Sequence, residues 1–279
     1  MLWLRIAAGF ALAYAFVLLA AWAFQERLAF PAPRAPVPDP KDVGIPEGER
    51  LELTTRGGTR LAGWYLPPKT EGNRSPDPSR AAGLLWFYGN GENIASLWSI
   101  LRDFQPPGAA LLVVDYPGYG GSEGRTTEPG ILEAAEAAYE ALARRPEVAR
   151  DRIFVYGRSL GTVPASHLAA TRPVAGLILE SPFTNAREMS ARHYGLLPRF
   201  VLRLRLDNLS NVARARCPVL VVHGTADRLV PPAMGRRVAA AAGGPVELAL
   251  IEGAGHNETY EVGGRAYRDK LWEFVRRAP

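Results

Sequence analysis

The chain has 279 residues, of which 47% are hydrophobic and 22% charged, and its formal net charge is +5. This hydrophobic content is enough for a buried core and excludes a disordered chain. The positive charge would suit an anionic partner, but no basic stripe interleaved with aromatic residues occurs, so we expect no nucleic-acid binding. The single cysteine, Cys217, excludes an internal disulfide and a cysteine-based metal cluster.

The first element along the chain is an apolar N-terminal segment. Residues 6–24 contain no charged side chain and would form a helix roughly 28 Å long, close to the thickness of the hydrocarbon core of a bilayer. Trp3, Trp22 and Phe24 lie near the two ends of this stretch, where interfacial aromatic residues are common. We therefore predict a single transmembrane anchor over residues 1–27.

Two other interpretations of this segment stay open. One is a cleavable signal peptide ending at Ala21-Trp22-Ala23, although its apolar stretch exceeds the usual length of roughly 7–15 residues. The other is a buried helix of a soluble domain, although the segment is apolar around its whole circumference. The positive-inside rule does not assign a side of the membrane to the domain, because Arg5 is balanced by Arg27, Arg34 and Lys41.

The next segment is rich in proline. Within residues 28–48, proline occurs at positions 31, 33, 36, 38, 40 and 46, which favours extended polyproline geometry and prevents a continuing helix. We predict a stalk over these residues. Residues 49–279 form the predicted folded domain, which begins with two strands joined by a hairpin at Gly57-Gly58, followed by a polar loop at residues 69–80.

Beyond this loop, short apolar runs alternate with amphipathic stretches. The runs predict buried strands at residues 84–88, 110–114, 153–156, 177–179, 219–222 and 246–251. The stretches predict helices at residues 94–104, 131–143, 160–170, 233–242 and 267–275. Regular alternation of strand and helix indicates right-handed crossovers. It therefore predicts an α/β fold with a mainly parallel eight-stranded sheet and helices on both faces.

One of these strands leads into a motif that carries chemistry. Residues 153–156 run directly into Gly157-Arg158-Ser159-Leu160-Gly161. A strand, a tight turn and a helix in this order give the G-x-S-x-G pattern its meaning, because the serine then lies on a strained turn at the edge of the sheet. The two glycines must lack a Cβ atom for the turn to close. We predict Ser159 as the nucleophile.

A serine hydroxyl needs a base to accept its proton and an acid to orient that base. His256 follows the last strand in a glycine-rich loop, residues 253–255, which can fold over the edge of the sheet where Ser159 lies. We predict His256 as the base. Of the other histidines, His167 lies on the helix after the nucleophile, which carries it away from Ser159, and His193 lies in the later arginine-rich insertion. His223 ends a strand, where we expect a structural role.

The orienting acid is predicted from chain order. Asp227 follows the strand at residues 219–222 and gives the order Ser, Asp, His that this arrangement requires. Glu180, at the end of the preceding strand, is the alternative. Asp115 also ends a strand, but we expect it to order its own loop.

Two backbone amides are needed to stabilise an oxyanion. We assign one to Leu160, next to the nucleophile, and the second to Asn90 in the glycine-containing loop 89–93, with Gly91 as the alternative. The sequence contains neither of the glycine motifs that bind phosphates in nucleotide-binding proteins. We therefore expect no nucleotide cofactor and no metal.

Five segments together resemble the BEM46-type α/β-hydrolases: residues 88–93, 115–122, 157–161, 180–183 and 223–227. The resemblance extends from about Gln25 to the C-terminus and includes the anchor, because members of that family often carry an N-terminal hydrophobic helix. It implies an α/β-hydrolase fold, a serine nucleophile at Ser159, hydrolysis of acyl esters or thioesters, and no cofactor. One departure is Tyr88-Gly89, where the family usually has His-Gly.

The insertion at residues 184–216 lies where α/β-hydrolases place a lid. Leu196, Leu197, Phe200, Val201 and Leu204 would form one face of a helix, with Arg199, Arg203 and Arg205 largely off it. We expect a lid helix packed on the domain. The alternative is that its arginines face anionic lipid headgroups, which would make the substrate lipid-like.

These inferences predict a membrane-anchored serine hydrolase of carboxylic esters or thioesters. The acyl-enzyme would form on Ser159, with His256 as base and Asp227 as orienting acid, and the substrate would be a small-molecule or lipid-like ester. A serine peptidase on the same fold and a non-catalytic membrane-anchored binding protein are the alternatives. The sequence assigns neither the acyl chain and leaving group nor the oligomeric state.

Overall fold

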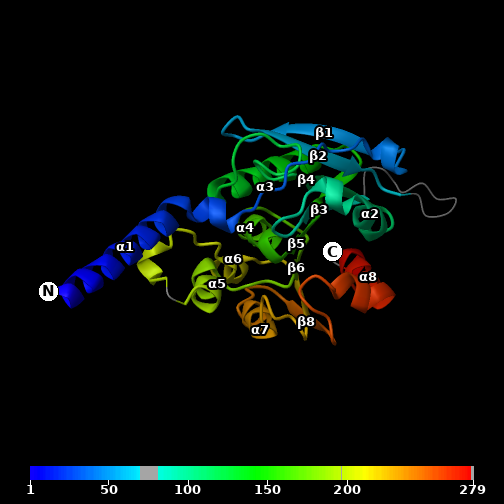
Figure 1. Cartoon of the computed structure of the whole chain (residues 1–279). Helices are drawn as coiled ribbons and strands as arrows, with labels where there is room; N and C mark the ends of the chain where they lie inside the picture. Colours follow the sequence, from blue (N-terminus) through cyan, green and yellow to red (C-terminus); the bar gives the residue numbers. More distant parts are fainter. Residues whose placement is uncertain (70–80, 196, 278–279) are drawn as a thin grey trace.

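The structure, a computed structural model, describes residues 1–69, 81–195 and 197–277. Within these residues the centre of the fold is an eight-stranded sheet with the order β1-β2-β4-β3-β5-β6-β7-β8 (Figure 1). The strands are β1 (Glu49–Thr54), β2 (Arg60–Leu66), β3 (Ala81–Phe87), β4 (Ala109–Val114), β5 (Val148–Arg158), β6 (Gly176–Glu180), β7 (Val219–Gly224) and β8 (Val246–Ile251). Strands β1 and β2 are antiparallel to their neighbours and the others run parallel. The predicted mainly parallel eight-stranded sheet is therefore confirmed.

Helices cover both faces of this sheet, as predicted (Figure 1). On one face lie α2 (Ile94–Phe104) and α8 (Thr259–Arg277), whose Phe104 and Tyr267 rings are 6.4 Å apart. The helices of the other face are α3 (Glu128–Ala143), α4 (Thr162–Thr171), α6 (Asn208–Arg214) and α7 (Pro232–Ala240). Helix α8 begins earlier than predicted and passes a kink at Gly264, because glycines there interrupt the pattern that would reveal a helix.

The carboxyl ends of the central strands meet at one edge. Arg158 at the end of β5 is in register with Glu180 at the end of β6, and Glu180 is in register with Val222 in β7. Side chains that follow these strands are thus brought together, although they are far apart in the sequence. In open α/β sheets, this edge is where active sites form.

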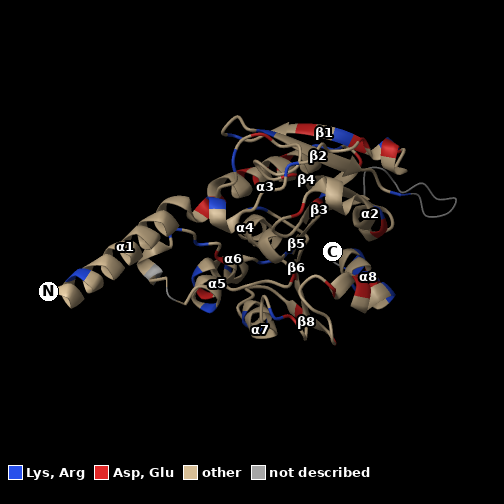
Figure 2. Ribbon diagram, in the orientation of Figure 1, with Lys and Arg blue, Asp and Glu red and all other residues tan. Residues whose placement is uncertain are grey.

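The N-terminal helix α1 (Leu2–Ala29) projects away from the domain (Figure 1). Figure 2 shows that its charged side chains lie only near its two ends. The most apolar part of this helix is exposed, and its length and composition suffice to cross a membrane. A signal sequence meets the same criteria, so the transmembrane anchor stays a prediction.

The proline-rich segment, residues 28–48, differs from the predicted stalk because it packs along the domain. Its buried hydrophobic side chains are Phe30, Val37 and Ile45. The carbonyl oxygen of Pro33 accepts a hydrogen bond from the Gly120 amide at 2.8 Å, and that of Pro38 accepts one from the Trp64 indole at 3.0 Å. Proline lacks an N–H donor but keeps its carbonyl acceptor, so donors of the domain can hold this segment.

The insertion at residues 184–216 also differs from expectation. It contains α5 (Ala186–His193), a short 3-10 turn η3 (Arg199–Val201) and α6. The single helix expected through Leu197 and Leu204 is therefore not formed, since residues 202–207 have no helical structure. The expected member Leu196 lies outside the described residues, as does the polar loop at 69–80 apart from Lys69.

Long-range hydrogen bonds explain why this helix is not formed. The backbone amides of Arg203 and Leu204 donate to the side chain of Gln25, and those of Arg205 and Leu206 donate to the carboxylate of Glu128. These acceptors replace the carbonyl groups that a helix would supply. Residues 203–206 are thus held between α1, which carries Gln25, and α3, which carries Glu128.

Candidate active site

Ser159 lies on a strained turn between β5 and α4. Its φ angle is +51°, a left-handed conformation that residues with a side chain adopt rarely, and typically at functional sites. Close backbone contacts explain the two glycines of the motif: a Cβ atom on Gly157 would clash with the carbonyl of Gly161, and one on Gly161 would clash with the carbonyls of Phe87 and Tyr88. The strand-turn-helix context predicted for this motif is thus present.

This packing yields a prediction for Gly161→Ala. We expect the substitution to lower the free energy of unfolding by about 3 kcal/mol, because the new methyl group must displace the backbone of β3. The midpoint of thermal unfolding would fall by roughly 6–12 °C. Gly195→Ala is the matched control, since a Cβ atom there lies 3.7 Å from its nearest neighbour, in ordinary contact. Equal melting of the two variants would contradict the close approach at Gly161.

The structure brings the three predicted side chains into one hydrogen-bonded chain. The His256 Nε2 atom lies 2.9 Å from Ser159 Oγ, and its Nδ1 atom lies 2.7 Å from Asp227 Oδ2. These distances allow the imidazole to accept the serine proton while the carboxylate holds its other nitrogen. Asp227 is almost fully buried and the His256 side chain is 10% exposed, so both side chains are largely shielded from solvent.

Asp227 is held in its charged form by donors on both oxygens. Its Oδ1 accepts hydrogen bonds from the backbone amides of Leu229 at 3.0 Å and Val230 at 2.8 Å. Burial alone would raise the pKa of Asp227, but hydrogen bonds from His223 and His256 outweigh it and hold that pKa well below its ordinary value. The carboxylate is therefore ionised at neutral pH.

His223 contacts Asp227, a role that is not predicted from the sequence. Its buried Nε2 atom lies 2.8 Å from the carbonyl oxygen of Val230 and 3.3 Å from Asp227 Oδ2. Both neighbours are acceptors, so Nε2 carries the proton and donates. The sequence feature that could have indicated this contact is the spacing of four residues between His223 and Asp227. The turn between them brings the carboxylate back beside the imidazole.

The remaining candidates lie away from Ser159. His167 Nε2 is 3.1 Å from a carboxylate oxygen of Glu136, and His193 Nε2 is 3.0 Å from the carbonyl oxygen of Leu229. Asp115 accepts hydrogen bonds from the amides of Ile94 and Gly121. It therefore orders its own loop, as expected, and it also holds the start of α2.

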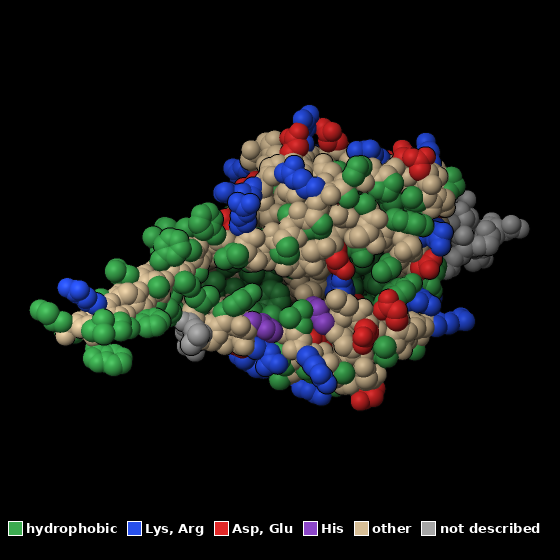
Figure 3. Space-filling model, in the orientation of Figure 1, with side chains coloured by type: hydrophobic (Ala, Val, Ile, Leu, Met, Phe, Trp, Pro, Cys, Tyr) green, Lys and Arg blue, Asp and Glu red, His purple; other side chains and the backbone are tan. Residues whose placement is uncertain are grey.

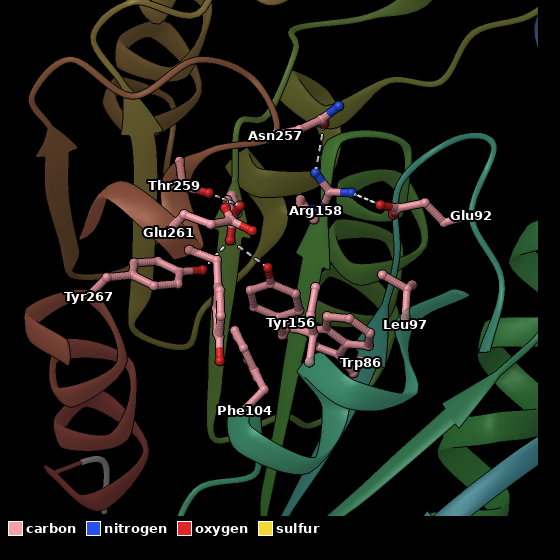
Figure 4. A pocket seen from close by; sticks show the side chains of 13 residues that line it. Trp86, Glu92, Leu97, Phe104, Tyr156, Arg158, Asn257, Thr259, Glu261 and Tyr267 are labelled. Carbon is pink, nitrogen blue, oxygen red and sulfur yellow. Dashed lines mark hydrogen bonds and ion pairs between the residues drawn. The ribbon is translucent and has the colours of Figure 1, made fainter. Parts of the chain in front are cut away.

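Glu180, the alternative acid, lies in a different environment. Its carboxylate accepts hydrogen bonds from the hydroxyl groups of Tyr156 (2.5 Å), Thr259 and Tyr267. Glu180 lines a cavity of about 130 Å³. The aromatic rings of Trp86, Phe104 and Tyr156 line the same cavity (Figure 4). No hydrogen bond joins Glu180 to a histidine among the described residues, so the geometry favours Asp227 over Glu180 as the orienting acid.

Arg158, at the end of β5, joins two loops near the candidate nucleophile. Its guanidinium pairs with Glu92 and donates to Asn257 Oδ1 at 2.9 Å (Figure 4), while Glu92 accepts a hydrogen bond from the Gly89 amide at 2.8 Å. Burial alone would lower the pKa of Arg158, but Glu92 and Glu180 raise it above its ordinary value. No pattern in the sequence predicts this connection between the strand before Ser159, the predicted oxyanion loop and the residue after His256.

The predicted oxyanion donors are Leu160, which follows Ser159 directly, and Asn90, which lies in the loop after β3. Leu160 begins the 3-10 turn η2 (Ser159–Gly161) together with Ser159, and the first amides of a helix have no partner within it. Asn90 belongs to the loop after β3, and its side chain is engaged with the carbonyl oxygen of Ala29 and the hydroxyl of Tyr119. The backbone roles of Leu160 and Asn90, and of the alternative Gly91, stay predictions.

Tyr88, the departure from the family pattern, points into the domain. It is fully buried, its hydroxyl donates to Asp115 Oδ1 at 3.0 Å, and its ring packs against Tyr116 at 4.6 Å. The Tyr88 side chain therefore anchors the start of loop 89–93 to the interior of the domain.

Comparison with known proteins agrees with this architecture. The Hydrolase_4 family model, described as serine aminopeptidase, S33, matches residues 78–210. An uncharacterized protein of Mycobacterium tuberculosis is 35% identical over 275 residues, 98% of this chain and 94% of that protein. Human alpha/beta hydrolase domain-containing protein 17B is 31% identical over 218 residues, 76% of this chain and 74% of the relative.

Among solved structures, an esterase of Pyrococcus furiosus superposes with a TM-score of 0.69 at 20% identity, covering 88% of this chain and 99% of the esterase. That similarity concerns the fold. The resemblance to BEM46-type proteins is consistent with all of these relatives. With 31% identity to a named α/β-hydrolase domain protein over three quarters of its length, and with the same sheet, the chain belongs to the α/β-hydrolase family.

Proposed function

We propose that the protein is a serine hydrolase that cleaves carboxylic esters or thioesters through an acyl-enzyme on Ser159. The observation that carries this proposal is the hydrogen-bonded chain from Ser159 through His256 to Asp227, with the serine at a positive φ angle. Each part of this arrangement has a chemical use. Membership of the α/β-hydrolase family supports the same reaction class.

The reaction would proceed in two steps. Ser159 Oγ attacks the carbonyl carbon of the ester while His256 Nε2 takes the hydroxyl proton, and the same nitrogen then gives that proton to the departing alcohol or thiol. Water repeats the sequence on the acyl-enzyme, which releases the acid and restores the serine. Asp227 would stabilise the imidazolium in both steps, and the amides of Leu160 and Asn90 would donate to the oxyanion.

An ester is favoured over a peptide as the substrate. The superposable esterase from Pyrococcus and an acetyl xylan esterase from Paenibacillus, which has a TM-score of 0.65 at 20% identity, support this choice. The description of the matching family as serine aminopeptidase keeps peptide hydrolysis as the second candidate. We further propose that α1 anchors the enzyme in a membrane, because its apolar length suffices and its apolar surface is exposed.

A fluorophosphonate probe tests the proposed reaction class. We expect the full-length protein in mild detergent to be labelled, because the probe modifies only a serine that is activated by a base. Heat-denatured protein is the control and should not react. Failure of the native protein to react would contradict the proposal.

Substrate class is tested by comparing p-nitrophenyl butyrate with aminoacyl p-nitroanilides. We expect the kcat/KM value for the ester to exceed that for the anilides by at least about 100-fold, since an amide is much less reactive toward acyl transfer and would need extra stabilisation of the amine leaving group. A higher kcat/KM value for the anilides than for the ester would favour peptide hydrolysis as the function.

A further inference from the structure

One buried polar side chain joins the N-terminal helix to the lid. Gln25 is 7% exposed, and its Oε1 atom accepts hydrogen bonds from the amides of Arg203 at 2.7 Å and Leu204 at 3.1 Å. Its Nε2 atom donates to the carbonyl oxygens of Trp22 at 2.9 Å and Val201 at 3.4 Å. Because both ends of the amide are paired, this contact fixes the orientation of the lid segment relative to α1.

The same end of α1 is joined to the predicted oxyanion loop. The carbonyl oxygen of Ala29, the last residue of the helix, accepts a hydrogen bond from Asn90 Nδ2 at 2.7 Å. Asn90 Oδ1 in turn accepts one from the hydroxyl of Tyr119 at 2.6 Å. Residues 22–29, which we call the foot of α1, thus contact both the lid segment and the loop that carries the predicted oxyanion donor Asn90.

The lid segment takes its position from these neighbours. Glu128 accepts hydrogen bonds from the amides of Arg205 and Leu206, both at 2.8 Å, next to the two amides that Gln25 accepts. Four consecutive amides are therefore satisfied by side chains of α1 and α3. A backbone held in this way moves if either of its supports moves.

Apolar side chains surround this junction. Phe200 in the lid is 80% exposed, and the 3-10 turn that contains it packs against α1. The Arg203 guanidinium lies 4.7 Å from the centre of the Trp22 ring, a pairing suited to the boundary between lipid and water. Figure 3 shows hydrophobic side chains along α1 and in a hollow of the same face, with histidine side chains at its rim.

We infer that the foot of α1 and the lid segment 200–206 form one unit that holds the entrance of the Ser159 site against a bilayer surface. The substrates would then be long-chain acyl esters taken from the membrane. A long apolar chain is costly to transfer through water, and an entrance at the bilayer removes that step. The inference rests on the proposed ester hydrolysis and on the proposed anchor, and it adds the lipid bilayer as the surface that the lid contacts.

Gln25→Leu tests the coupling in full-length protein reconstituted into phosphatidylcholine vesicles. Leucine is of similar size but cannot accept hydrogen bonds from the amides of Arg203 and Leu204. The lid segment would therefore no longer be held in a fixed position on α1. We expect kcat/KM for p-nitrophenyl laurate in the vesicles to fall about tenfold or more, while that for water-soluble p-nitrophenyl butyrate changes less than about twofold.

Gln105→Leu is the matched control for this variant. Gln105 is also buried, and its amide bonds backbone carbonyls beside the start of β4, at the opposite edge of the sheet from Ser159. We expect it to lower the melting temperature without changing the ratio of laurate to butyrate hydrolysis. An equal loss on both esters in Gln25→Leu, or a changed ratio in Gln105→Leu, would overturn the inference.

Contact with the bilayer is tested without catalysis. A fluorophore is attached through Phe200→Cys or, as the control, through Val246→Cys at the start of β8, both in a Cys217→Ser background. Val246 is also exposed, but it lies at the opposite edge of the sheet. We expect doxyl-labelled lipids to quench the label at position 200 and to spare the label at 246. Equal quenching, or none, would refute the membrane-facing lid whether or not the enzyme hydrolyses esters.

Discussion

Ser159→Ala and His256→Ala are each expected to lower kcat for p-nitrophenyl butyrate by about 10⁵-fold or more, close to the background rate. In the proposed mechanism the two side chains act as one unit, since the proton would pass across the 2.9 Å contact between them. The double variant should therefore be no slower than either single variant. Initial rates with purified full-length protein, together with fluorophosphonate labelling, measure all three.

A histidine without this contact supplies the control. His193 in α5 is exposed and faces the carbonyl oxygen of Leu229, so His193→Ala should retain kcat within about threefold. If the Ser159 and His256 effects multiplied in the double variant, the two residues would be acting independently. The proposed proton transfer would then be wrong.

The second large effect distinguishes the two candidate acids. We expect Asp227→Asn to lower kcat by about 10⁴-fold, for a reason specific to this site. Asp227 Oδ1 receives two backbone amides, so the oxygen of an asparagine would stay there and its NH₂ group would face His256 Nδ1. That donor forces the proton onto His256 Nε2, which can then no longer accept one from Ser159.

Glu180→Gln is the matched substitution. It also exchanges a buried carboxylate for an amide, but the partners of Glu180 are hydroxyl groups of Tyr156, Thr259 and Tyr267. We expect a loss of about 1–3 kcal/mol in the free energy of unfolding and a change in kcat of less than about tenfold. A catalytic loss larger for Glu180→Gln than for Asp227→Asn would assign the acid to Glu180.

Much of this site was predictable because its signals are local. The motif around Ser159 follows an apolar run, and the expected strands and helices place its surroundings at one edge of a sheet. Chain order then narrows the acid and the base to a few residues, among which the structure brings Asp227 and His256 to Ser159. The parallel sheet makes this possible, because its strand ends converge whatever the sequence distance.

The contacts that escaped prediction join residues with no local signature. Gln25 and Arg203 are 178 positions apart, and Arg158 and Asn257 are 99 apart. The lid pattern at residues 196–204 suggested a helix, but tertiary acceptors at Gln25 and Glu128 outcompeted the local ones. Hydrophobic periodicity reports the local preference of a segment for a helix. In the folded protein this preference is overridden by the hydrogen bonds to Gln25 and Glu128.

The packing of the proline-rich segment also bears on how the enzyme is best shortened for crystallisation. A protein cut at Glu49 would lack the buried side chains of Phe30, Val37 and Ile45, and the Trp64 indole would lose its hydrogen-bond acceptor on Pro38. Such a fragment would expose a hydrophobic surface that is covered in the full chain, and it would tend to aggregate. A protein shortened immediately before Phe30 would keep the packed part of the proline-rich segment, and we expect it to aggregate less than one cut at Glu49.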